Sequence, residues 1–253
     1  MLKSFRYIRP AIASVLLFST TALQAAEIDD ARQYLACTKL AREKPEEGLE
    51  TGLAWRDLGG GNPAEHCVIV AMIELRYYDV AARRLEVLAQ TMKGEAALRA
   101  DVLGQAGQAW LLHGDAIRAE ANLTTALGLV PGHPDHLVDR ARARAALADY
   151  GGAVSDLDQA IAAQPSRADA YVFRAAALRY LDRRPKALAD AEHALTLAPN
   201  NTEALLERGI LRRLAGDDEG ARHDWVRVLE LLPESETARL ARANIERMDV
   251  KRE

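Results

Sequence analysis

The sequence predicts an all-α solenoid of repeated helix pairs, and three columns of residues support this prediction. Proline recurs every 34 residues, at Pro131, Pro165, Pro199 and Pro233. Twelve residues before each proline stands an alanine, at Ala119, Ala153, Ala187 and Ala221. Small residues also stand 24 positions before each proline, at Gly107, Ala141, Ala175 and Gly209. A fixed period with small residues in one register indicates a repeated helical unit that packs against its own neighbours.

The composition suits closely packed helices rather than one bulky core. Of the 253 residues, 49% are hydrophobic, 28% are charged and only 5% are aromatic. Small side chains let helices approach closely in a stacked array. The formal net charge of −4 makes the chain mildly acidic, whereas a nucleic-acid-binding protein presents a basic face. We therefore expect no nucleic-acid partner.

Residues 1–26 have the pattern of a secretory signal peptide. Three basic residues precede a mainly apolar run over residues 11–23, and the small residues Ala25 and Ala26 follow it. The alternative is a retained membrane anchor, which would need roughly 20 apolar residues. We expect cleavage after Ala25 or Ala26, with export to a bacterial periplasm and membrane contact only through the signal peptide.

The rest of the chain divides into three parts. Two divergent repeats are expected over residues 27–98, four regular repeats over residues 99–234 and a capping helix over residues 235–253. In the divergent part, helices are predicted over residues 29–44, 45–58, 63–76 and 79–92, and the last two are expected to form a pair. Gly59, Gly60 and Gly61 interrupt the pattern, and Asn62 is placed to cap the third helix.

The proline and alanine columns over residues 100–233 resemble the tetratricopeptide repeat, with a weaker match back to about residue 28. This resemblance implies a right-handed solenoid of about six helix-turn-helix units, in which the first helix of each unit lines a concave groove for a peptide or helix of another protein. The family's groove positions correspond here to Val138, Arg142, Ala145, Val172, Ala176, Arg179, Tyr180, Leu206, Ile210 and Arg213. This mixture suits an apolar segment with a few acidic groups. The alternative is that some of these side chains fill gaps between helices.

Arginine and aspartate recur together in three of the regular repeats. Each arginine precedes its aspartate by 16 residues, which predicts ion pairs between the two helices of a repeat for Arg140 and Asp156, Arg174 and Asp190, and Arg208 and Asp224. In the preceding repeat both positions change, to Ala106 and Asn122. The alternative is a row of arginines that contacts the ligand.

Acidic residues also recur near the start of each first helix, at Asp101, Asp135, Asp169 and Glu203. We expect them in the first helical turn, where the helix dipole favours a negative charge.

The chain contains two cysteines, Cys37 and Cys67. In an oxidising compartment an even count favours a disulfide, here closing a loop of about 30 residues. Two separate thiols, or a metal or redox site with His66, are the alternatives. His133 and His136 lack the spacing of a four-ligand zinc site, so we expect no metal and no cofactor.

Catalytic motifs are absent from the sequence, and the signal, repeats and terminal helix leave no segment for a catalytic domain. The sequence therefore favours a non-enzymatic protein-binding scaffold of the bacterial cell envelope. The alternatives are a metal- or redox-linked periplasmic protein that uses Cys37, His66 and Cys67, and a self-assembling structural module.

Overall fold

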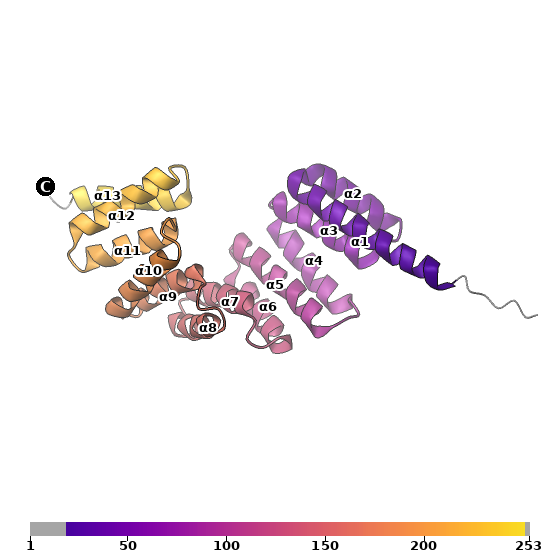
Figure 1. Cartoon of the computed structure of the whole chain (residues 1–253), viewed down its shortest axis with the longest axis horizontal. Helices are drawn as coiled ribbons and strands as arrows, with labels where there is room; N and C mark the ends of the chain where they lie inside the picture. Colours follow the sequence, from indigo (N-terminus) through magenta and orange to yellow (C-terminus); the bar gives the residue numbers. More distant parts are fainter. Residues whose placement is uncertain (1–18, 251–253) are drawn as a thin grey trace, which may run out of the picture. The chain divides into compact units, whose positions relative to one another are not determined.

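The computed structural model describes residues 19–250, which form thirteen α-helices and no strand (Figure 1). The prediction of an all-α repeat solenoid is confirmed. The chain divides into two compact units, an N-terminal unit over Met1–Glu74 and a C-terminal unit over Leu75–Glu253. None of the described helices is long and apolar enough to cross a membrane. The predicted signal segment lies outside the described residues up to residue 18, and its remainder begins the first helix.

The N-terminal unit contains three helices that pack on one another: α1 (Ser19–Glu43), α2 (Pro45–Asp57) and α3 (Gly61–Glu74). Pro45 is the first residue of α2, where its missing N–H costs no hydrogen bond. The core of the unit joins Trp55 to small residues such as Ala41 and Ala64. Cys37 of α1 and Cys67 of α3 form a disulfide in this core, with their Cα atoms 6.0 Å apart.

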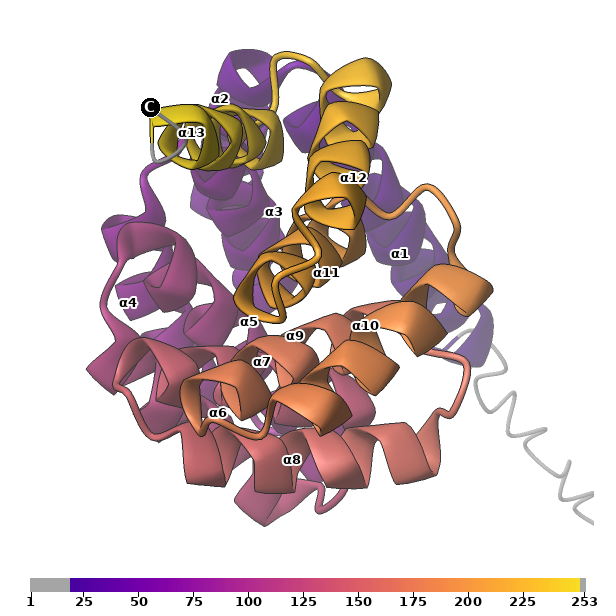
Figure 2. The same ribbon diagram turned by 90° about the vertical axis from the view of Figure 1, so that its left-hand side faces the viewer.

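The C-terminal unit contains the remaining ten helices: α4 (Tyr78–Thr91), α5 (Ala96–His113), α6 (Ala116–Leu129), α7 (Pro134–Ala146), α8 (Tyr150–Ala163), α9 (Ala168–Tyr180), α10 (Arg184–Leu197), α11 (Thr202–Leu214), α12 (Asp218–Leu231) and α13 (Glu236–Val250). Figure 2 shows the succession of the pairs α7/α8, α9/α10 and α11/α12. Each even-numbered helix from α6 to α12 ends two residues before one of the prolines that recur every 34 residues. The proline explains this stop, because it disfavours the helical conformation in the residue before it.

The odd-numbered helices line one side of the C-terminal unit. From α5 to α13 each odd-numbered helix packs on the next one, whereas no two even-numbered helices of the described chain share a comparable interface. An array that is closer-packed on one side curves toward that side. The first helices of the repeats therefore form its inner face.

Two expectations about the divergent part were wrong. The third and fourth predicted helices belong to different units: α3 packs on α1 and α2, and α4 packs on α5. The reason is that Ala64, Cys67 and Ala71 of α3 belong to the core that contains the disulfide. In addition, α3 begins at Gly61, so Asn62 lies within the helix rather than at its cap.

The turn inside each regular repeat uses a left-handed backbone at the same position. Gly114 and Gly216 have φ values of 92° and 87°, and Ala148 and Asp182 have φ values of 61° and 57°. Glycine adopts this region without steric cost, while alanine does not. All four regular repeats therefore keep the left-handed turn. In two of them a residue other than glycine, Ala148 or Asp182, occupies this less favourable conformation.

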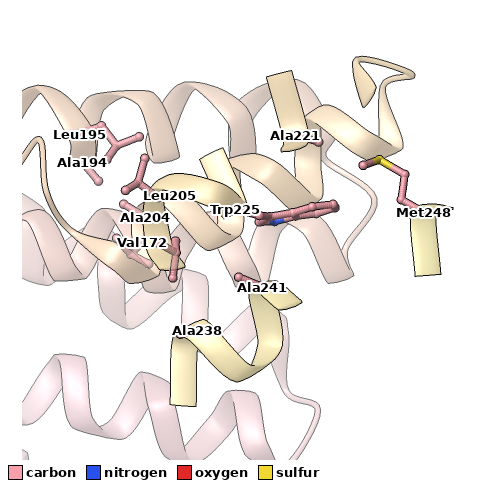
Figure 3. Close-up of a cluster of buried hydrophobic side chains, with 11 residues drawn as sticks. Val172, Ala194, Leu195, Ala204, Leu205, Ala221, Trp225, Ala238, Ala241 and Met248 are labelled. Atoms are coloured by element: carbon pink, nitrogen blue, oxygen red, sulfur yellow. The ribbon is translucent and has the colours of Figure 1, made fainter. Parts of the chain in front are cut away.

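Trp225 lies at the centre of the core that closes the C-terminal end (Figure 3). It packs with Ala221 of its own helix and with Ala238, Ala241 and Met248 of α13. Gly209 of α11 provides the space, because a Cβ atom there would lie 2.3 Å from the indole Nε1. This close approach explains why position 209 is small, and α13 covers the last repeat as the capping helix should.

Candidate binding groove

The three arginine–aspartate pairs are present between the helices of the regular repeats. Arg140 donates to both carboxylate oxygens of Asp156, at 2.8 and 2.7 Å. Arg174 and Asp190 do so at 2.7 and 2.8 Å, and Arg208 and Asp224 at 2.9 and 2.6 Å. The three carboxylates are buried. These arginines serve the packing of the helix pairs, and the hydrogen bonds to Asp190 and Asp224 raise the pKa of Arg174 and Arg208 above the usual range.

A second arginine reaches the same aspartate in two of these repeats, which the sequence reasoning missed. Arg144 donates to Asp156 and Arg212 donates to Asp224, each at 2.9 Å. Each lies four residues after the first arginine, so both side chains occupy one face of the helix. The i, i+4 spacing of Arg140 and Arg144 was the signal that could have shown this.

Glu86 of α4 supplies the missing acceptor in the repeat that lacks the ion pair. Its Oε1 accepts hydrogen bonds from Trp110 Nε1 and Asn122 Nδ2, each at 2.7 Å. Asn122 stands at the aspartate position of this repeat. A carboxylate from the preceding helix therefore takes the place of the aspartate at this interface.

Two of the predicted groove residues are core residues and must be removed from the candidate surface. Val138 is 2% exposed and Val172 is 5% exposed. Val138 packs with Leu137, and Val172 belongs to the core around Trp225. Both side chains fill the space between neighbouring repeats, so they offer no surface to a partner.

The three arginines of the predicted groove already have carboxylate partners. Arg142 pairs with Asp139 at 3.0 Å, Arg179 pairs with Glu207 at 2.5 Å, and Arg213 pairs with Asp218. Paired guanidinium groups offer little charge to a ligand. These ion pairs offset much of the positive charge that this face was expected to offer to acidic groups, and that expectation stays a prediction.

The inner face contains a small apolar hollow between α7, α8 and α9. It has a volume of about 140 Å³ and includes four of the predicted positions, Arg142, Ala145, Ala176 and Tyr180. The ring of Tyr180 stacks on that of Tyr150, with centroids 4.5 Å apart and planes within 3°. Tyr180 remains 59% exposed, and the guanidinium of Arg179 lies 4.5 Å from its ring. The hollow thus has an exposed aromatic wall that its neighbours hold in place.

Leu206 and Ile210, the last two predicted positions, lie half-buried on α11. Both pack against the core around Trp225. The two side chains therefore mainly join α11 to its neighbours, as the alternative interpretation of these positions expects.

A larger polar hollow adjoins the apolar one along the same face. It has a volume of about 640 Å³ and shares Arg142 and Phe173 with the apolar hollow. Its lining contains five acidic residues and two arginines, Asp101, Asp135, Asp139, Asp169, Glu203, Arg142 and Arg167. Five carboxylates against two guanidinium groups give this hollow an excess of three negative charges.

Two histidines and one of these acids meet inside the polar hollow. His133 is the N-cap of α7 and His136 lies in its first turn; their rings stack with centroids 4.0 Å apart. Asp101 lies in the second turn of α5, because that helix begins at Ala96, and the expectation that this acid occupies a first turn was wrong. Burial, and then the nearby His133, lower the pKa of His136 and favour its neutral form. The sequence showed the two histidines as a pair but not their proximity to Asp101, because this acid comes from the preceding repeat.

The alternative site of Cys37, His66 and Cys67 is not available as a set of metal ligands. Both sulfur atoms are in the disulfide, so neither is a thiolate. The Nδ1 atom of His66 lies 2.9 Å from the hydroxyl of Tyr34. The disulfide and the contact between Tyr34 and His66 instead hold α1 against α3.

Comparison with known proteins identifies the fold. No protein-family model matches the chain, and no curated protein matches it. Among solved structures, MamA 41-end from Desulfovibrio magneticus RS-1 is 21% identical, with 69% of this chain and 97% of that chain covered and a TM-score of 0.59. TTC0263, a thermophilic TPR protein of Thermus thermophilus, is 20% identical, with 73% and 98% covered and a TM-score of 0.60. The Cut9–Hcn1 structure matches 90% of this chain and 45% of its own, at 13% identity and a TM-score of 0.68.

Proposed function

We propose that this chain, which has the tetratricopeptide-repeat fold, is a non-enzymatic scaffold that binds a segment of another protein along the inner face of its C-terminal unit. The apolar hollow with the exposed ring of Tyr180 carries this proposal. An exposed aromatic side chain beside a pocket is typical of the residues that dominate binding energy at interfaces. The helices that hold the hollow are packed on both sides, so the surface is preorganised and little ordering is needed on binding.

The partner segment has one apolar side chain and basic neighbours. The apolar hollow, at about 140 Å³, has the size of a cavity that accommodates benzene, which fits one leucine or phenylalanine side chain. Complete burial of such a side chain contributes about 1.5–3 kcal/mol. The adjoining polar hollow is negative, so lysine or arginine next to the apolar residue is favoured over aspartate or glutamate.

The proposed location is the bacterial cell envelope, most simply the periplasm. The disulfide between Cys37 and Cys67 supports it, because such bonds persist in oxidising compartments. The signal-like pattern of residues 1–26 points in the same direction. Mass spectrometry of the chain isolated from the producing cell tests this part: a first residue at Ala26 or Glu27 is expected, and a full-length cytoplasmic chain with free thiols contradicts it.

Site-specific crosslinking tests the binding face. A photoreactive phenylalanine analogue replaces Tyr180, and the purified mature chain is irradiated with an envelope extract. We expect a discrete crosslinked protein whose attached segment contains an apolar residue flanked by basic ones. The same analogue at Tyr77, an exposed aromatic residue before α4, is the matched control and should give no such product.

Blocking the hollow separates specific capture from chance contact. Ala145→Glu places a charge in the apolar hollow, and we expect it to abolish the product from position 180. Gln159→Glu adds the same charge to an exposed position of α8 and should leave the product unchanged. A product that survives Ala145→Glu, or equal products from positions 77 and 180, would place binding elsewhere.

A further inference from the structure

The strongest unexplained feature of the molecule is a pair of buried histidine nitrogens in the polar hollow. His136 is 5% exposed. Its Nε2 and the Nδ1 of His133 are the buried side-chain nitrogen or oxygen atoms that have no hydrogen-bond partner among residues 30–250. A buried polar atom without a hydrogen-bond partner is unfavourable, and a ligand bound by both nitrogens would explain why two such atoms lie side by side.

A carboxylate completes the group from the neighbouring repeat. The Oδ1 of Asp101 lies 3.9 Å from Nε2 of His136, too far for a hydrogen bond. One ligand atom from each of Asp101, His133 and His136 lies within 4.8 Å of the other two. Two imidazoles and a carboxylate around one point form a donor set that binds zinc in proteins, with a fourth position left for water or another ligand.

The backbone is shaped around this group. A Cβ atom at Gly104 of α5 would lie 2.3 Å from Cε1 of His136, so no larger residue fits while the imidazole keeps its place. Gly104 and Asp101 lie three residues apart on one face of α5. The same turn of helix therefore supplies the space for His136 and the carboxylate opposite it.

The electrostatic surroundings favour a cation. The hollow that contains the three residues has an excess of three carboxylates over arginines. The side chain of Asp101 is 55% exposed, so a metal ion can reach the site from solvent. Imidazole nitrogens select transition metals such as Zn²⁺ over Ca²⁺ and Mg²⁺, which prefer oxygen ligands.

We infer that Asp101, His133 and His136 form a binding site for a divalent transition-metal ion, most simply Zn²⁺, on the inner face of the C-terminal unit. His133 is the N-cap of α7, and binding of one ion by both imidazoles requires its ring to turn from the stacked orientation that it has on His136. The ion joins α5 to the start of α7 and links two consecutive repeats. Its open position faces the polar hollow.

Metal titration of the mature chain, without a histidine tag, tests the site. Calorimetry with Zn²⁺ should show one equivalent bound, and Co²⁺ should give the visible absorption of a four-coordinate nitrogen–oxygen site. Asp101→Asn and His133→Gln should each weaken Zn²⁺ at least roughly tenfold. Zn²⁺ should also raise the melting temperature of the wild-type chain more than that of these variants.

Two controls keep the test decisive. His193→Gln removes an exposed imidazole from α10 and should leave Zn²⁺ affinity unchanged. Circular dichroism checks that Asp101→Asn, a change at an exposed carboxylate, leaves the fold intact. Absence of binding at micromolar Zn²⁺, or binding that survives both Asp101→Asn and His133→Gln, overturns the inference.

Discussion

The carboxylate of Asp190 accepts hydrogen bonds from Nε and Nη2 of Arg174, at 2.7 and 2.8 Å, and so joins α9 to α10. Removal of Arg174 leaves the carboxylate of Asp190 shielded and unpaired, which costs about 3–5 kcal/mol for a buried pair. Removal of Asp190 leaves Arg174 with Asp158 at 2.7 Å, whose side chain is 57% exposed and which therefore holds the guanidinium less strongly. We predict that Asp190→Ala destabilises the chain more than it does in an Arg174→Ala background. The coupling energy, about 0.5–3 kcal/mol, is measured by urea unfolding of the four members of a double-mutant cycle.

The repeat before it provides a matched comparison. Asp156 pairs with Arg144 as well as with Arg140, so an Arg140→Ala chain keeps one of its charge partners. The Arg140/Asp156 cycle should therefore give a smaller coupling energy than the Arg174/Asp190 cycle. Additive losses in the Arg174/Asp190 cycle would show that this ion pair contributes no interaction energy.

Ala148 has a left-handed backbone with a φ of 61°, at the turn where two of the other regular repeats have glycine. This conformation costs an alanine roughly 1–2 kcal/mol. We predict that Ala148→Gly stabilises the chain by up to about 1 kcal/mol, because relief of strain exceeds the added freedom of the unfolded chain. Chemical denaturation measures the difference, with Ala146→Gly in the last turn of α7 as a control that should destabilise. Equal effects of the two substitutions would mean that the turn carries no strain.

Contacts that recur in every repeat could be predicted from the sequence, because each one leaves a column at the 34-residue period. The alanine and proline columns predicted the helix pairs, and the 16-residue spacing predicted which arginine meets which aspartate. Such columns identify residues that are repeated for packing. The groove positions instead came from the resemblance to the tetratricopeptide repeat, and two of them, Val138 and Val172, are buried between repeats.

Contacts that occur once could not be predicted in this way. Glu86 of α4 takes the role that an aspartate of the second helix has in the other regular repeats. Asp101 of α5 lies near His136, which belongs to the next repeat. Neither relationship has a period, so neither leaves a column in the sequence. The packing of α3 on α1 and α2 also escaped prediction, because alternation of helices along the chain does not show which neighbour each helix packs on.

The disulfide is predicted to stabilise the N-terminal unit selectively. Cys37 and Cys67 are 30 residues apart, and closure of a loop of this length contributes roughly 3.5 kcal/mol in the chain-entropy model. Reduction, or the paired change of both cysteines to serine, should increase amide hydrogen exchange in α1 to α3 and leave α9 to α12 unchanged. Hydrogen exchange by mass spectrometry resolves the two units. Equal protection of α1 to α3 with and without the bond would contradict this prediction.

Gly209 and Gly128 both lie within helices, yet we predict opposite effects when each is replaced by alanine. A Cβ atom at Gly209 would lie 2.3 Å from the indole of Trp225, which is fixed in the core, so Gly209→Ala overpacks the α11/α12 interface. Overpacking of this kind costs about 1–3 kcal/mol. A Cβ atom at Gly128 of α6 meets no atom within 4 Å, so Gly128→Ala should stabilise by roughly 0.5–1 kcal/mol through helix propensity alone. Urea unfolding of the two variants measures both signs, and stabilisation by Gly209→Ala would show that Trp225 moves aside without cost.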